Sequence, residues 1–182
     1  MKGKQNNLKS VDNLDDFSVV FFFFNILFLL YEKKAILNTI NGLELFYRSL
    51  FVGAIIASIF LVILNYKNPL FYSQSKRKLI LNFQIFMSIA FFTATTTNLI
   101  NCKLADDILI CKNYSIQKIN YETGNGRHYS NAKIDLKLEN NQNQTFEIDI
   151  DLYLQLLGTG EIKLCKRKGI FGYDYVTRFE SK

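Results

Sequence analysis

Few side chains in this sequence could carry out acid–base chemistry. The single histidine, His128, follows the glycine-containing turn sequence at 124–126. A general base needs a positioned partner and usually a cleft, and a lone histidine beside a turn is far more often a surface residue. The glycine pairs at 124–126 and 158–160 are not followed by a predicted helix, so neither forms a phosphate-binding loop. We therefore predict no catalytic and no cofactor-binding residue.

The three cysteines are Cys102, Cys111 and Cys165. Their spacing matches no zinc-binding pattern, and His128 would be the only nitrogen ligand, so we predict no metal site. If the C-terminal part lies outside the cytoplasm, a disulfide would join Cys102 to Cys111 or Cys111 to Cys165 and leave one free thiol. If that part is cytoplasmic, all three are expected to be reduced packing residues. Both alternatives stay open.

The run Lys166-Arg167-Lys168 has the chemistry to bind a lipid headgroup or a phosphate. Three acidic side chains lie near it in the sequence: Glu161, Asp174 and Glu180. We favour the simpler interpretation, in which these carboxylates balance a solvated strand end.

The formal net charge of +6 has an informative location. Residues 1–16 hold three lysines and three aspartates, residues 17–101 hold seven basic and two acidic side chains, and residues 102–182 hold twelve and eleven. A nucleic-acid-binding surface would concentrate the excess on the soluble part, so this class of function is excluded. Basic side chains that lie between apolar segments instead orient a membrane protein.

Three uncharged apolar runs cover residues 17–31, 49–66 and 79–102. As helices they would measure about 22, 27 and 36 Å, against a hydrocarbon core of about 30 Å. Between residues 50 and 64 the only polar side chain is Ser58, so the second run lacks the polar stripe of a soluble helix. We predict about three transmembrane helices, at 17–31, 49–66 and 79–101, after a tail at 1–16.

The first apolar run has two alternative interpretations. A signal peptide is disfavoured because acidic residues precede the run and no small-residue cleavage site follows it. An interfacial helix is disfavoured because four consecutive phenylalanines, at 21–24, leave no polar face. A short spanning helix fits best, and Asn25 near its middle would then need a partner inside the bundle.

Small residues four positions apart occur in the second and third runs. Gly53 and Ala57 form one such pair, and Ala90 and Ala94 form the other. This spacing lets helix backbones approach closely, which drives association within a membrane. We favour an antiparallel hairpin within the chain, and a homo-oligomer is the alternative.

The basic residues predict the orientation. With three spans, residues 1–16 and the 67–78 loop share one side and carry seven basic side chains, against three in the 32–48 loop. This bias places the tail in the cytoplasm and residues 102–182 outside the cytoplasm. The membrane that the chain spans is expected to be the cytoplasmic (inner) membrane. With two spans the bias points weakly the other way.

After residue 107 the apolar period changes to two. Residues 133–139 and 146–151 alternate apolar and charged side chains around a polar turn, which predicts a β-hairpin. Residues 108–111 and 114–121 are expected to form one bent strand or two short ones. Further strands are expected at 161–166 and 171–179, and 152–157 is either a strand or a short helical turn. We predict a small antiparallel β domain at 102–182, barrel- or sandwich-like with five or six strands, or a roll with one short helix.

The sequence identifies no reaction. We expect a non-enzymatic integral membrane protein whose β domain contacts an unknown protein partner, as an accessory subunit or an immunity-type protein. A membrane-anchored module that binds a small ligand or lipid, or an enzyme, is the alternative. No cofactor is expected.

Overall fold

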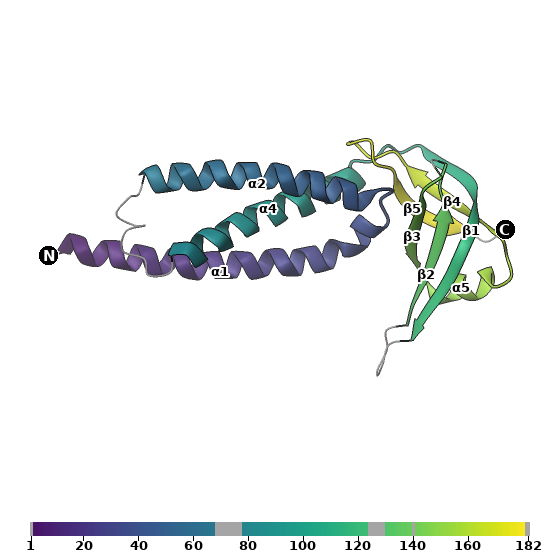
Figure 1. Ribbon diagram of the computed structural model, residues 1–182, viewed down its shortest axis with the longest axis horizontal. Helices are drawn as coiled ribbons and strands as arrows, with labels where there is room; N and C mark the ends of the chain where they lie inside the picture. Colours follow the sequence, from purple (N-terminus) through teal and green to yellow (C-terminus); the bar gives the residue numbers. More distant parts are fainter. Residues whose placement is uncertain (1, 68–77, 124–129, 140, 181–182) are drawn as a thin grey trace. The chain divides into compact units, whose positions relative to one another are not determined.

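The computed structural model describes residues 2–67, 78–123, 130–139 and 141–180 (Figure 1). It contains two compact units. The first, which we call the helical unit, comprises Met1–Glu32 and Phe46–Thr97, and the second, the sheet unit, comprises Lys33–Leu45 and Asn98–Lys182. The connection between the first two helices therefore belongs to the sheet unit, although the sequence places it within the membrane half.

The three long helices are α1 (Lys2–Leu37), α2 (Gly42–Lys67) and α4 (Lys78–Lys103). Two of them, α2 and α4 from Leu79, are long and apolar enough to cross a membrane. Helix α1 begins at Lys2 rather than at Phe17, because no glycine or proline interrupts the sequence from Lys4 to Leu37. The predicted 67–78 loop lies almost wholly outside the described residues.

The helical unit buries several polar side chains and exposes many apolar ones. The exposed fractions of Ser18, Asn25 and Ser88 are 3%, 1% and 0%, whereas Val20 and Leu27 of α1 are 66% and 65% exposed. Apolar side chains on α2 and α4 are exposed in the same way: Phe51, Val52, Ile55, Ile59, Val62, Ile80 and Phe83. A soluble helical bundle shows the opposite distribution.

Helices α1 and α4 lie side by side and run in the same direction. Ser18 Oγ donates a hydrogen bond to Gln84 Oε1 at 2.9 Å. Further along both helices, the ring centroids of Phe21 and Phe28 lie 6.1 and 6.4 Å from that of Phe92. Asn25 bonds within its own helix rather than to another helix as expected: its Nδ2 donates to the Phe21 carbonyl oxygen at 2.7 Å, and its buried Oδ1 makes no hydrogen bond.

The sheet unit contains one antiparallel five-stranded sheet with the order β3-β2-β1-β4-β5 (Figure 1). The strands are β1 (Leu109–Thr123), β2 (Ser130–Lys137), β3 (Asn143–Ile148), β4 (Glu161–Arg167) and β5 (Tyr175–Glu180). The predicted hairpin is β2–β3, with Ile134 opposite Phe146 in the core. The predicted strand at 108–121 is a single long strand, β1.

The sheet curls around its core, so that side chains of its two outer strands meet. The rings of Phe146 on β3 and Phe179 on β5 lie 5.7 Å apart, edge to face. A single curled sheet with one helix, α5 (Ile150–Leu156), takes the place of a two-sheet sandwich. The residues buried in this core are Tyr114, Ala132, Ile134, Leu136, Leu138, Phe146, Ile148, Leu156, Ile162, Leu164 and Val176.

At 152–157 the structure contains the helical alternative that the sequence left open, and the last strand has a different start from the predicted one. The apolar run at 152–157 is largely helical, because Leu152, Tyr153 and Leu156 lie on one helical face that packs on the core. The last strand begins at Tyr175 rather than at residue 171. Gly172 has a φ of 82° and forms a turn with Gly169, which an extended strand does not allow.

Candidate functional site

The connection between α1 and α2 adds a short strand-like segment to the sheet. The Ile40 amide donates to the Asp174 carbonyl oxygen at 2.7 Å, and the Val176 amide donates to the Asn38 carbonyl oxygen at 2.8 Å. Thr39 and Tyr175 form an antiparallel bridge between these two bonds. Residues 38–41, which we call the closing segment, therefore cover part of the free edge of β5.

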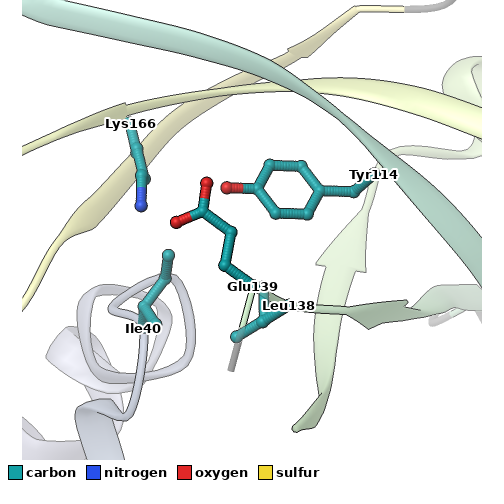
Figure 2. Close-up of a pocket in the computed structure, with 5 residues that line it drawn as sticks. All are labelled: Ile40, Tyr114, Leu138, Glu139 and Lys166. Carbon is teal, nitrogen blue, oxygen red and sulfur yellow. The ribbon is translucent and has the colours of Figure 1, made fainter. Parts of the chain in front are cut away.

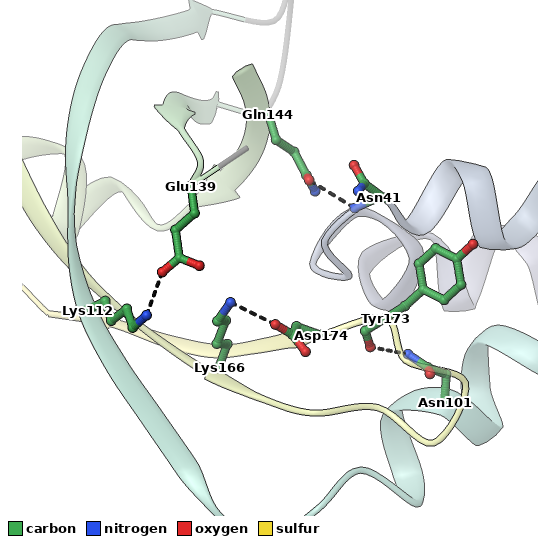
Figure 3. A network of polar contacts seen from close by, with 8 residues as sticks. All are labelled: Asn41, Asn101, Lys112, Glu139, Gln144, Lys166, Tyr173 and Asp174. Atoms are coloured by element: carbon green, nitrogen blue, oxygen red, sulfur yellow. Dashed lines mark hydrogen bonds and ion pairs between the residues drawn. The ribbon is translucent and has the colours of Figure 1, made fainter. Parts of the chain in front are cut away.

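The side chain of Gln144 on β3 holds the other side of the closing segment. Its Nε2 donates to the Thr39 carbonyl oxygen at 2.9 Å, and its Oε1 accepts from the Asn41 amide at 3.0 Å (Figure 3). Ile40 packs against the core of the curled sheet. The closing segment thus bridges the two outer strands, β3 and β5, and completes the curl.

The turn that leads into α2 requires particular residue types at positions 41 and 42. Asn41 has a φ of 56°, in the left-handed region that asparagine tolerates better than most residues. A Cβ atom on Gly42 would collide with the Ile36 carbonyl oxygen, so only glycine fits there. The chain can therefore leave α1, pair with β5 and enter α2 within a few residues.

A small polar cavity opens beside the closing segment. It has a volume of about 190 Å³ and is lined by Ile40, Tyr114, Leu138, Glu139 and Lys166. Figure 2 shows the Tyr114 hydroxyl, the Glu139 carboxylate and the Lys166 amine pointing toward one another. This volume is below the range of about 300–1,000 Å³ that is common for small-molecule sites.

The charged groups of this cavity pair with one another or with neighbours. Lys112 Nζ lies 2.6 Å from Glu139 Oε1, and Lys166 Nζ lies 2.7 Å from Asp174 Oδ2 (Figure 3). The hydrogen bond from Lys112 lowers the pKa of Glu139 and raises the pKa of Lys112. Burial lowers the pKa of Lys166, but the hydrogen bond and charge of Asp174 outweigh it, so that the pKa is raised. These shifts favour the charged forms, which suits ion pairing better than proton transfer.

The basic run at 166–168 is accordingly balanced in part by acidic neighbours. Lys166 pairs with Asp174, as the sequence suggested, and Arg167 Nη1 lies 3.9 Å from Asp107 Oδ1. Glu180 pairs instead with Lys163 and Arg178.

Asn101, in the last turn of α4, anchors the turn before β5. Its side chain is fully buried; Nδ2 donates to the Tyr173 carbonyl oxygen at 2.8 Å, and Oδ1 accepts from the Phe171 amide at 3.1 Å (Figure 3). A Cβ atom on Gly169 would collide with this amide side chain. Sequence reasoning missed the anchor, because an asparagine at the end of an apolar run does not reveal partners some seventy residues away.

The structure joins Cys111 to Cys165 by a disulfide with an S–S distance of 2.08 Å. The two residues lie directly opposite each other on β1 and β4. Cys102 takes no part in the disulfide, and its Sγ lies 3.5 Å from Thr39 Oγ1 in the closing segment. Of the two pairings that the sequence left open, the structure contains the second.

The small residues singled out in the sequence face one another between α2 and α4. Ala57, Ala90 and Ala94 are at most 2% exposed. A Cβ atom on Gly53 would lie 2.9 Å from both Ala90 Cα and Thr93 Cβ, so the two backbones are in close approach there. These residues therefore form an interface within one chain.

Replacing Gly53 by leucine should force α2 and α4 apart and destabilise the helical unit by about 1–3 kcal/mol, the usual cost of overpacking. The measurement is the unfolding midpoint of the full chain in detergent. Ser58→Leu places the same side chain at an exposed position of α2 and should leave the midpoint unchanged. Equal midpoints for Gly53→Leu and the wild type would contradict the assigned interface.

Helix α5 and its cap present an apolar ridge to the outside of the sheet unit. Ile150, Leu154 and Leu157 are 39%, 59% and 55% exposed and recur at a helical spacing. The opposite face of the helix packs on the core through Leu156. Tyr153, partly buried against the core, also contacts Tyr121, with the two rings tilted by 31° and their centroids 5.4 Å apart.

Other features from the sequence analysis lie outside the part of the chain that the structure describes, including His128 and the turn at 124–126. Among the described residues, no group of three or more His, Cys, Asp or Glu side chains is arranged to hold a metal ion. Comparison with protein-family models, curated proteins and solved structures finds no match to this chain.

Proposed function

We propose that the chain is an integral membrane protein with three spans, α1, α2 and α4. The observation that supports α1 as the third span is its inverted polarity: Ser18 and Asn25 are buried, while Val20, Leu27 and Leu30 are 64–66% exposed. In a bilayer, polar side chains face the bundle interior and apolar ones face lipid. The contacts of Ser18, Phe21 and Phe28 with α4 fit a helix that crosses in parallel with it.

We further propose that the sheet unit lies outside the cytoplasm. With three spans, the seven-to-three bias of basic residues between the two sides favours this orientation. The Cys111–Cys165 disulfide supports it independently, because disulfides persist in oxidising compartments and are rare in the cytosol.

Cysteine labelling tests the orientation. In a Cys102→Ser chain, a cysteine replacing the exposed Lys118 should react with a membrane-impermeant maleimide on intact cells whose outer barrier, if present, is permeabilised. A cysteine replacing Ser75, in the 67–78 loop of the sequence, should react only after lysis. The reverse pattern would invert the topology and refute the extracytoplasmic sheet unit.

The function we propose for the sheet unit is contact with a protein partner, without catalysis, as an accessory subunit or an immunity-type protein. The apolar ridge on α5 carries this proposal, because exposed apolar surface on a folded domain commonly marks an interaction site. The small cavity favours the same conclusion, since its two charged residues, Glu139 and Lys166, each pair with a neighbouring side chain and its volume is small.

The ridge predicts where a partner binds. A photo-crosslinking residue at Leu154 should give one discrete product in cells, and Ile150→Asp should abolish it by placing a charge in the apolar contact. The same residue at Lys118, exposed on β1, is the control and should give none. Equal products from both positions, or none from Leu154, would refute the ridge as the contact. A product of twice the chain's mass would identify a second copy as the partner.

A groove on the sheet unit favours the alternative of a small-ligand or lipid-binding module. It has a volume of about 540 Å³, within the common range for ligand sites. Its walls come from residues 36–44 and 142–145, around the closing segment. A copurifying small molecule that is lost in a Gln144→Leu chain would support this alternative over the protein contact.

A further inference from the structure

A second group of exposed apolar side chains lies on the sheet unit, away from the ridge in the sequence. Leu104, Ile108, Ile170 and Phe171 are 61%, 72%, 57% and 48% exposed. We call these four residues the apolar patch. Two come from the link between α4 and β1, and two come from the turn between β4 and β5.

Backbone contacts bring the two halves of the patch together. The Asp106 amide donates to the Lys168 carbonyl oxygen at 2.9 Å, and Leu109 lies opposite Arg167 at the start of the β1–β4 pairing. The link at 104–108 therefore runs beside the turn at 168–172. The four exposed side chains of the patch are therefore carried by two neighbouring segments.

The patch is connected to the end of helix α4, which is long enough to cross a membrane. Leu104 directly follows Lys103, the last residue of α4. The Phe171 amide binds Asn101 Oδ1 in the last turn of that helix, at 3.1 Å. The patch therefore sits where α4 would leave the hydrocarbon core.

Charged side chains adjoin the apolar patch, an arrangement that is also typical of protein segments at a membrane interface. Lys103 and Lys168 are exposed beside it, Arg167 is half-buried, and the acidic residues nearby are Asp106 and Asp107. Long basic side chains can place their charge among headgroups while their stems lie along apolar surface. The nearly balanced charge makes apolar burial, rather than attraction to anionic lipid, the main contribution.

We propose that the apolar patch inserts into the headgroup–acyl boundary of the bilayer that α4 crosses, and so fixes the sheet unit on the membrane surface. The partner is the lipid surface itself. This inference rests on the proposed membrane assignment of α4, and it adds a second, peripheral membrane contact that the spanning helices do not require.

Tryptophan fluorescence tests the insertion, because the chain contains no tryptophan. Single-tryptophan variants of the full chain are reconstituted in phosphatidylcholine vesicles with and without brominated acyl chains. Phe171→Trp and Ile170→Trp report on the patch, Phe60→Trp reports on an exposed site within α2, and Tyr121→Trp reports on the far end of β1. A urea-unfolding midpoint of the sheet unit like that of the wild type verifies that each variant is folded.

The proposal expects blue-shifted emission and loss of most intensity in brominated lipid for Phe171→Trp or Ile170→Trp, with water-like, unquenched emission for Tyr121→Trp. Unquenched emission from both patch variants, with Phe60→Trp quenched, would overturn the insertion and leave the membrane assignment intact. Equal quenching of Tyr121→Trp would overturn it too, because the whole unit would then lie on lipid. Unquenched Phe60→Trp would refute the membrane assignment itself.

Discussion

A chain with both Cys111 and Cys165 replaced by alanine is expected to lose about 4 kcal/mol of stability in its sheet unit. The disulfide joins residues 54 apart, and closing a loop of that length removes entropy from the unfolded chain by about this amount. The measurement is pulse proteolysis of the full chain in urea, followed on the C-terminal fragment.

Reduction of the wild type distinguishes the stability lost with the cross-link from the stability lost through changed packing. Cys165 is fully buried, so alanine there also leaves a small cavity. A reductant should destabilise the wild type by most of the same amount and leave the double variant unchanged. A wild type whose urea midpoint is insensitive to reductant would show that the two thiols are not joined, and the sheet unit would then lose its independent support for an extracytoplasmic location.

The sheet shows what alternating sequence patterns can predict. The hairpin of β2 and β3 was predictable because Ile134 and Leu136 alternate with charged residues, and only one register buries both. The position of β4 beside β1 was not predictable in this way. It depends on a connection through α5 that crosses from the edge strand β3 to the middle of the sheet.

The helix interface was also accessible from the sequence, because small residues four apart have one strong interpretation in a membrane-length helix. Gly53 and Ala57 were assigned to a contact on this basis alone, and the structure puts Gly53 against Ala90. The role that we propose for α1 as a third span was less accessible, because the uncharged run at 17–31 is short. The described length of α1, together with the burial of Asn25, comes only from the structure.

The closing segment could not be predicted from the local sequence. Residues 38–41 carry no strand pattern, and their strand-like conformation depends on the edge of β5 and on Gln144 of β3. Tertiary contacts more than a hundred residues apart in the chain select that conformation. The ion pair beside the cavity is similar, since Lys112 and Glu139 are exposed residues 27 apart in the sequence that only the fold brings together.

Asn101→Ala is expected to destabilise the sheet unit by about 2–6 kcal/mol. The fully buried amide makes two hydrogen bonds to the backbone of the turn before β5, and its loss leaves the Phe171 amide and the Tyr173 carbonyl without these partners. Each buried group left unsatisfied costs about 1–3 kcal/mol. Hydrogen exchange of the Phe171 amide should accelerate together with the loss of stability in urea.

The matched control is Asn65→Ala on α2. That side chain donates to the Leu61 carbonyl oxygen within its own helix, so its loss removes a local bond and leaves the sheet unit untouched. If Asn101→Ala changed the stability of the sheet unit no more than Asn65→Ala does, the buried amide would not hold the turn. The same turn carries Ile170 and Phe171 of the apolar patch. A large loss of stability in Asn101→Ala would therefore also show that the end of α4 and the apolar patch unfold together.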